Sequence, residues 1–186
     1  MGANPKATRN AMSISSAATP ALHTLPVPFL SSVMAIEPHW IDYNGHLNMA
    51  YYNVLFDRAL DQLWLTLGIG PDYVQSRGGS TFTAECHVRY LRELHLGDPA
   101  QVAVWVIAAD DKRLHTFEEL RHADEGWLSA SSENMNLHVD MASRKTAPFP
   151  PDIKDRINAF AQAHRTAPRP DGIGRQVAMP SKAAAR

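Results

Sequence analysis

The segment Asp42-Tyr-Asn-Gly-His-Leu-Asn48 brings together side chains that can carry out nucleophilic or general-base chemistry. A carboxylate such as Asp42, placed just before a glycine-containing loop, can attack a carbonyl carbon or polarise a water molecule for that attack. Asp also favours turns, where it only caps the backbone. The sequence leaves both roles open for Asp42.

Four neighbours of Asp42 are further candidates for the same chemistry. Gly45 allows close backbone approach and unusual dihedral angles, and the first N–H groups of a following helix can join it as donors to a carbonyl oxygen. His46 is a candidate to hydrogen-bond substrate or to position Asp42; the alternative is a structural donor of the loop. Asn44 and Asn48 are candidates to orient water, and Asn48 is equally suited to cap the helix that follows.

Charged residues further along the chain form a second group of candidates. Asp57 lies nine residues after Asn48 on the flank of an apolar stripe, as either a second catalytic carboxylate or a member of a surface ion pair. Glu85, His87 and Arg89 share one face of a predicted strand, about 7 Å apart from one to the next. A Glu–His pair there performs acid–base work, binds a cation, or belongs to a solvated polar stripe.

Aromatic and basic side chains supply candidates for ligand binding. The aromatic residues near the segment are Trp40, Tyr43, Tyr51 and Tyr52. Aromatic faces attract quaternary ammonium groups, so these residues form either a cage for such a ligand or part of the core. The basic candidates for phosphate binding are Arg89, Arg92, Lys112 and Arg113. Such cations suit phosphate groups, but surface turns carry them as well.

The composition excludes several classes of protein. With 186 residues and a formal net charge of −1, the chain has the length of one domain with tails and lacks the positive charge of a general nucleic-acid binder. No apolar stretch approaches the roughly 20 residues of a membrane helix. The single cysteine, Cys86, excludes an internal disulfide and a thiolate-rich zinc site, so the cytoplasm is the expected compartment. No metal or dinucleotide motif is present, and no such cofactor is expected.

Hydrophobic periodicity predicts one long helix followed by strands. Apolar residues recur at helical spacing from Asn48 to the stop signal at Gly68, which predicts a helix of about 20 residues. The predicted strands cover residues 32–37, 80–91, 101–109, 114–122 and 127–140, and a short amphipathic helix covers 152–164. Short turns favour antiparallel neighbours. The predicted fold class is therefore α+β, with an antiparallel sheet wrapped around one central helix.

Strict alternation in the strand at 80–91 assigns its side chains to two faces. Phe82, Ala84 and Cys86 are predicted to share one face, and Thr83 and Glu85 the other.

The tails are predicted from composition. Residues 1–30 are rich in Ala, Ser, Thr and Pro and hold no acid, which predicts a disordered N-terminal tail; a targeting peptide is the alternative. The domain is predicted to span residues 31–164. Residues 165–186 are basic, contain proline and lack periodicity, so a flexible C-terminal tail is expected.

The order of these elements, together with residues 42–48, resembles the hot-dog-fold acyl-CoA thioesterases of the 4-hydroxybenzoyl-CoA thioesterase type. That family's pattern places an Asp three residues before a Gly, then a His-aliphatic-Asn run and a Tyr, matched here by Asp42, Gly45, His46-Leu-Asn48 and Tyr52. Val88-Arg-Tyr-Leu91 and Leu96-Gly-Asp98 also resemble the family, and the resemblance covers residues 33–147.

The resemblance implies a hot-dog fold and hydrolysis of an acyl-CoA to a free acid and coenzyme A, without a metal or organic cofactor. It implies Asp42 as nucleophile or general base. It also implies a homodimer or a dimer of dimers with sites at the dimer interface, where Asp57 is a second carboxylate supplied across that interface.

A narrower resemblance is to the betainyl-CoA thioesterases of carnitine breakdown. It is carried by residues 42–46, Gly78-Gly79-Ser80, Glu85–Arg89, Lys112–His115 and Leu137–Asp140. The chain has Asn48-Met49 where Thr-Glu is expected in that subgroup, so the acyl group stays open. One alternative is a hot-dog hydratase or dehydratase, but the predicted helix contains no His, which counts against it. The other alternative is a non-enzymatic acyl-CoA-binding module.

Overall fold

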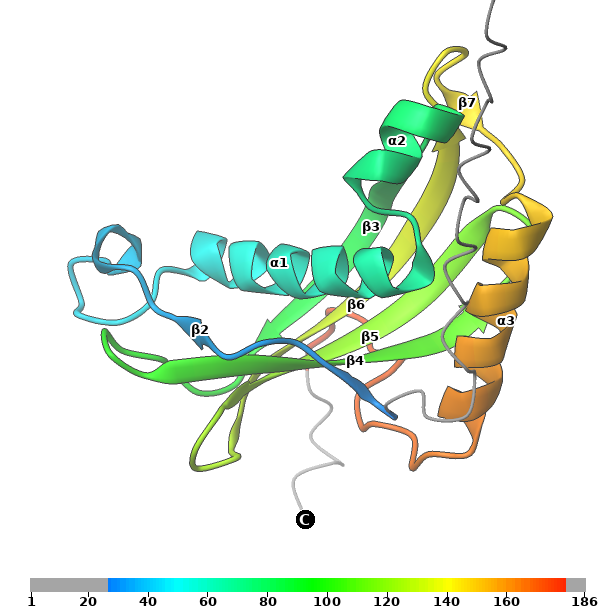
Figure 1. Cartoon of the computed structure of the whole chain (residues 1–186). Helices are drawn as coiled ribbons and strands as arrows, with labels where there is room; N and C mark the ends of the chain where they lie inside the picture. Colours follow the sequence, from blue (N-terminus) through cyan, green and yellow to red (C-terminus); the bar gives the residue numbers. More distant parts are fainter. Residues whose placement is uncertain (1–26, 180–186) are drawn as a thin grey trace, which may run out of the picture.

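The central helix α1 (Met49–Leu67) has ends that match the sequence signals. Asn48 Oδ1 accepts a hydrogen bond from the Ala50 N–H at 3.0 Å, which caps the first turn. Gly68 ends the helix in the left-handed conformation with a φ of 79°, which glycine adopts without strain. The predicted helix is therefore confirmed in position and length. In the computed structural model, which describes residues 27–179, α1 lies across the curved face of the sheet (Figure 1).

The sheet is antiparallel throughout its named pairings. Its strands are β1 (Phe29–Leu30), β2 (Met34–Ala35), β3 (Gly79–Tyr90), β4 (Pro99–Ala109), β5 (Arg113–His122), β6 (Leu128–Asp140) and β7 (Lys145–Thr146). The main order is β1-β4-β5-β6-β3, with β2 paired to β4 and β7 paired to β6. Among the described residues β3 pairs only with β6, so one long edge of β3 is open. This is the predicted α+β hot-dog arrangement.

Shorter helices flank this frame. They are the 3₁₀ turn η2 (Pro38–Trp40), α2 (Pro71–Arg77) and α3 (Pro151–Arg165). Ile153 and Ile157 of α3 are buried in the main core, and α3 stands beside the end of the sheet in Figure 1. Arg77 donates two hydrogen bonds, of 2.8 and 2.9 Å, to Asp152, which ties α2 to α3. Within residues 27–179 no helix is long and apolar enough to cross a membrane.

The sheet separates a large core from a small one. Leu114 and Leu120 of β5 face α1 and belong to the large core. Phe117 lies on the opposite face, in a small cluster that Ile173 partly covers. Gly174 N donates to Glu133 Oε2 at 2.7 Å. Part of the predicted C-terminal tail thus contacts the outer face of the sheet.

The predicted boundary at residue 31 falls inside the sheet. Phe29 and Leu30, which the sequence assigns to the N-terminal tail, pair with Val104 and Ala103 of β4. Residues 1–26 and 180–186 lie outside the described residues, so the rest of the N-terminal prediction and the last part of the C-terminal one are not addressed.

A bulge in β3 changes the predicted faces of that strand. The register with β6 shifts between Thr83 and Glu85, so Ala84 has no partner on β6. A bulge of this kind adds one residue to one strand, so the alternation restarts after it. Thr83 therefore lies on the same face as Cys86, and Phe82 is turned away and 60% exposed. The predicted grouping of Phe82 with Cys86 was wrong for this reason.

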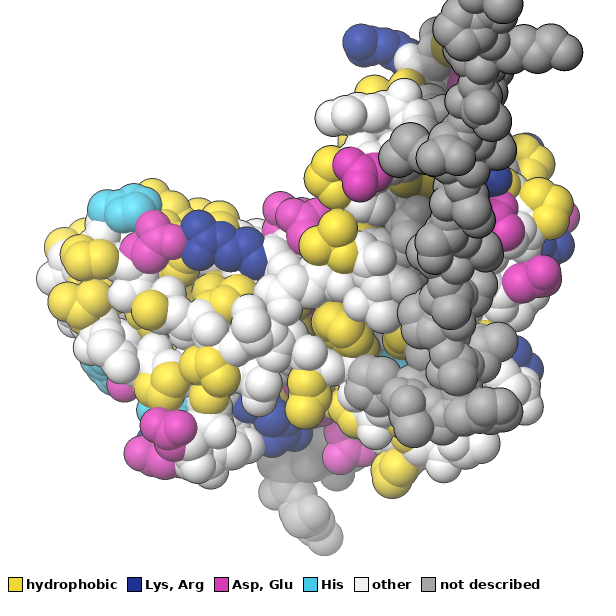
Figure 2. Space-filling model, in the orientation of Figure 1, with side chains coloured by type: hydrophobic (Ala, Val, Ile, Leu, Met, Phe, Trp, Pro, Cys, Tyr) yellow, Lys and Arg dark blue, Asp and Glu magenta, His cyan; other side chains and the backbone are white. Residues whose placement is uncertain are grey.

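The surface charges are mixed. On the face drawn in Figure 2, Lys and Arg side chains are interspersed with Asp and Glu rather than gathered into one patch.

Candidate active site

The loop between η2 and α1 folds back on itself around Asp42. Ile41 and Leu47 form an isolated antiparallel bridge at its base. Asp42 N donates to His46 O, and Gly45 N donates to Asp42 O, both at 3.0 Å. Gly45 has a φ of 86°, a conformation that favours glycine. The Gly45 N–H is thus committed to the loop rather than presented to a ligand.

The Asp42 side chain both caps this turn and keeps one oxygen available. Its Oδ1 accepts from the Asn44 N–H at 2.8 Å. Its Oδ2 lies 3.8 Å from His46 Nδ1, and the side chain is 15% exposed. The capping role and a chemical role are therefore compatible, because they use different oxygens. Asn48 is engaged as the helix cap, so its amide oxygen is occupied.

The four aromatic candidates do not form a single cage in this chain. Trp40 is buried and stacks on Tyr51, with ring centroids 5.6 Å apart. The guanidinium of Arg58 covers the Trp40 ring at 4.8 Å. Tyr52 is buried, and its hydroxyl accepts a backbone hydrogen bond at 3.3 Å. Tyr43 is 96% exposed. These placements put three of the four residues in the packing around α1 and leave Tyr43 in solvent.

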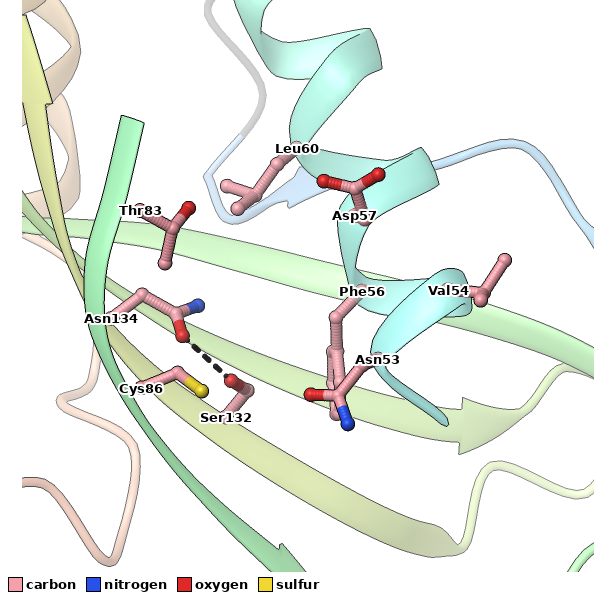
Figure 3. A pocket seen from close by; sticks show the side chains of 9 residues that line it. All are labelled: Asn53, Val54, Phe56, Asp57, Leu60, Thr83, Cys86, Ser132 and Asn134. Carbon is pink, nitrogen blue, oxygen red and sulfur yellow. Dashed lines mark hydrogen bonds between the residues drawn. The ribbon is translucent and has the colours of Figure 1, made fainter. Parts of the chain in front are cut away.

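A pocket of about 330 Å³ lies between α1 and strands β3 and β6 (Figure 3). It is lined by Asn53, Val54, Phe56, Asp57, Leu60, Thr83, Cys86, Ser132 and Asn134. Asp57 projects from α1 at this pocket and forms no ion pair with any residue from 27 to 179. A helix rises about 1.5 Å per residue, so Asp57 is about 12 Å along the axis from the first turn, where the Asp42 loop ends. Asp42 and Asp57 therefore mark two separate positions along α1.

Glu118 of β5 lies next to the β6 wall of this pocket, and it is not among the candidate residues named from the sequence. Its side chain is fully buried, and Asn134 Nδ2 donates to its Oε1. Its Oε2 is buried without a hydrogen-bond partner among the described residues. Ser132 Oγ donates to Asn134 Oδ1 at 2.9 Å, which continues the network to the pocket wall. A signal was present in the sequence, since Glu118 is spaced by even numbers of residues from the apolar Leu114 and Leu120 and therefore shares their face of the strand.

The carboxyl groups around the pocket affect one another. Burial raises the pKa of Glu118 well above its ordinary value; the hydrogen bond from Asn134 opposes this rise, and the charge of Asp57 adds to it. Burial and the charge of Asp57 also raise the pKa of Asp61, one turn further along α1. No Lys or Arg is among the nine residues that line the pocket.

Glu85, His87 and Arg89 do share a face, but it is the outer face of the sheet. Glu85 and His87 line a separate pocket of about 290 Å³ there, with His115 and Glu133, which lie 2.7 Å apart. The Arg89 guanidinium lies against Gly172. The sheet thus separates these three residues from the pocket under α1.

The remaining basic candidates lie at opposite ends of the sheet. The guanidinium of Arg92, beyond the end of β3, stacks 3.8 Å over Trp127. Arg113, at the β4–β5 turn, pairs with Asp110 at 2.6 Å, and this contact raises the pKa of Arg113. Lys112 is exposed in the same turn. Within this chain the four basic candidates therefore do not converge on one phosphate site.

Comparison with known proteins identifies the family. A family model described as the thioesterase-like superfamily matches residues 36–157. This chain belongs to the thioesterase-like superfamily. It is a thioester hydrolase, as the resemblance implied.

Two curated relatives of this thioesterase-like chain are informative. A betainyl-CoA thioesterase from Pseudomonas aeruginosa is 38% identical over 145 residues, which cover 78% of this chain and 91% of the relative. An L-carnitine dehydrogenase/betainyl-CoA thioesterase from Rhizobium meliloti is 36% identical over 142 residues, which cover 76% of this chain and 28% of that longer protein.

Solved structures agree with this membership. A hypothetical protein from Staphylococcus aureus, solved in complex with CoA, superposes with a TM-score of 0.76 at 26% identity, covering 84% of this chain and 99% of that one. A putative thioesterase from Pseudomonas putida KT2440 has a TM-score of 0.72 at 33% identity, covering 85% of this chain and all of that one. The predicted fold and family are therefore confirmed.

Proposed function

We propose that this thioesterase hydrolyses a small acyl-CoA, with the betainyl group as the preferred acyl group, to a free acid and coenzyme A. The observation that carries this proposal is the similarity to the betainyl-CoA thioesterase of Pseudomonas aeruginosa, at 38% identity over nearly the whole length of that relative. The CoA-bound structure from Staphylococcus aureus supports the coenzyme A part of the substrate.

In this proposal Asp42 supplies the reacting carboxylate. By one route Asp42 Oδ2 attacks the thioester carbonyl, the C–S bond breaks, coenzyme A leaves as the thiol after protonation, and water cleaves the resulting anhydride. By the other, Asp42 accepts a proton from a water molecule that attacks the same carbon; the C–S bond then breaks, and the proton held by Asp42 goes to the departing thiolate of coenzyme A. Asp42 precedes the N-terminus of α1, which is the positive end of the helix dipole. That end stabilises the negative charge that develops on the carbonyl oxygen in both routes. Neither route needs a metal or an organic cofactor.

The proposal is tested by free-thiol release from a panel of acyl-CoA esters. We expect betainyl-CoA to be cleaved faster than short aliphatic, long aliphatic and aroyl esters. If a different ester is cleaved and betainyl-CoA is not, the proposed thioesterase activity stands, but the proposed acyl group is wrong. Tight binding of the esters without thiol release would instead support the binding-module alternative.

We also propose that two copies pair through the open edge of β3, as a homodimer or as the unit of a dimer of dimers. The unpaired edge of a 12-residue strand offers backbone groups that a second antiparallel β3 can satisfy. The proposal places the reaction in the cytoplasm, where the free thiol of Cys86 stays reduced.

Sedimentation equilibrium checks this interface. We expect a mass about twice the 20.6 kDa of the chain, or four times it for a dimer of dimers. The Ala84→Pro variant should lower that mass, because proline removes an N–H from the strand at the bulge, where Ala84 has no partner on β6. Ala84→Ser is the matched control and should keep the mass of the unmodified protein. A monomeric unmodified chain would contradict the proposal.

A further inference from the structure

The pocket under α1 combines apolar walls with carboxyl groups that have no cationic partner. Phe56 and Leu60 provide apolar surface, and Asp57 lies beside them. Asp61 follows one turn along α1, and Glu118 contacts the pocket residue Asn134. None of these three acids forms an ion pair with a residue of the described part of the chain. Acidic groups left in this state can be neutralised by protons or by a cationic ligand.

Glu118 is the feature that points to a ligand. Buried carboxyl groups are normally paired or fully hydrogen-bonded, because removing them from water is costly. Glu118 is fully buried, yet its Oε2 has no hydrogen-bond partner in residues 27–179. Its Oε1 is held by Asn134, which lines the pocket, and Ser132, its register partner on β6, lines it too. The carboxyl group is therefore in direct contact with the pocket wall, on the strand next to it.

A quaternary ammonium group needs this kind of environment. It carries a positive charge but no N–H, so it cannot be recognised by donating hydrogen bonds. Apolar walls contact its methyl groups, while nearby anionic groups stabilise its charge. The volume of about 330 Å³ is at the small end of the range of ligand sites, in keeping with a small acyl group.

We propose that this pocket is the subsite for the positively charged end of the acyl group, and that Glu118 determines its preference for a quaternary ammonium over an uncharged group of the same shape. Asp57 contributes a second negative charge at the pocket wall. This inference rests on the proposed acyl-CoA hydrolysis and adds to it the residues that select the acyl group. Because only one CH2 group separates the betainyl nitrogen from the thioester carbonyl, the Asp42 that reacts with an ester held in this pocket is that of the second copy in the proposed dimer. Burial raises the pKa of Glu118 well above its ordinary value, and the positive charge of a cation bound in the pocket would oppose that rise.

The test compares two esters that differ in charge but hardly in shape. Betainyl-CoA carries a trimethylammonium group, and 3,3-dimethylbutyryl-CoA carries a tert-butyl group in the same place. We expect the unmodified enzyme to prefer betainyl-CoA in kcat/KM by at least about 10-fold, and Glu118→Gln to remove most of this preference. The kcat/KM for the uncharged ester should change by less than about 2-fold, since Gln fills the same volume and can still accept from Asn134.

The matched control is Glu119→Gln, on the same strand but on the opposite face of the sheet. Glu119 is paired with Arg121 at 2.7 Å and does not line the pocket under α1. This variant should keep the ester preference of the unmodified enzyme. Thermal unfolding of both variants checks that each is folded.

A binding measurement separates failure of this subsite from failure of the proposed hydrolysis. Tetramethylammonium is titrated into the unmodified protein and both variants, and binding is followed by NMR. We expect Glu118→Gln to weaken this binding by at least about 10-fold and Glu119→Gln to leave it unchanged.

Binding that depends on Glu118, without hydrolysis of either ester, would support the subsite and overturn the proposed function. Equal hydrolysis of both esters by the unmodified enzyme would overturn the subsite and leave the hydrolysis in place. If Glu118→Gln does not fold, competitive inhibition of the unmodified enzyme by tetramethylammonium, beyond that of sodium at equal ionic strength, supports the subsite, and its absence overturns it.

Discussion

Replacing Asp42 with Asn should lower kcat by about 10²- to 10⁴-fold, the range typical for loss of a positioned general base. An amide can neither attack the thioester as a carboxylate does nor accept the proton of an attacking water. The loop should survive the change, because the Asn side-chain oxygen can still accept the Asn44 N–H that Asp42 Oδ1 accepts at 2.8 Å. We therefore expect KM and the melting temperature to change little. Steady-state kinetics and thermal unfolding measure both.

Asp124→Asn is the matched control for this experiment. Asp124 is an exposed carboxylate in the β5–β6 turn, so the same chemical change there should leave kcat within about 2-fold of the unmodified enzyme. Full activity of Asp42→Asn would show that Asp42 serves only as a turn cap. In that case Asp57 would become the leading catalytic carboxylate.

Replacing Leu63 with Ala should cost about 2–5 kcal/mol of unfolding free energy, because it leaves a cavity in the tight packing between α1 and the sheet. Leu63 is completely buried in the main core. For a chain of this length, each 1 kcal/mol lowers the melting temperature by about 2–4 °C, so we expect a fall of about 4–20 °C. Differential scanning calorimetry gives the value directly.

Leu65 provides a control of the same residue type on the same helix. It is 60% exposed, against 0% for Leu63. Leu65→Ala should therefore change the unfolding free energy by only about 0.5 kcal/mol. A loss for Leu63→Ala no larger than that for Leu65→Ala would contradict the assignment of α1 as the element on which the core is built.

Much of the fold could be predicted because its signals are local. Asn48 and Gly68 cap α1 through their own side chain and backbone, and the period of the residues between them is helical. The short helix α2 has Pro71 at its start and Gly78 at its end, but its seven residues hold only about two turns, too few for a helical period to show in the sequence. The faces of β3 were misassigned before the bulge because the sequence does not show where a ladder takes an extra residue.

The candidate site could be predicted only where it is continuous in sequence. The Asp42 loop was found because its residues are neighbours, and the structure places His46 and Asn44 around that carboxylate. The pocket under α1 was missed because it joins Asp57 to strands whose pairing is decided by the whole sheet. Glu118 and Asn134 are 16 positions apart and meet only through the β5–β6 register.

The bulge at Ala84 has a consequence for length variation among relatives. A chain without Ala84 would form a regular ladder with β6 and keep Thr83 and Cys86 facing α1. Loss of a residue from the regular part of β3 would instead reverse the two faces of one portion of the strand. Charged side chains would then face the pocket in place of the hydroxyl and thiol groups. In an alignment of a relative with this chain, a one-residue gap opposite Ala84 is thus compatible with an unchanged pocket wall. A gap elsewhere in β3 indicates that the relative has a different pocket wall.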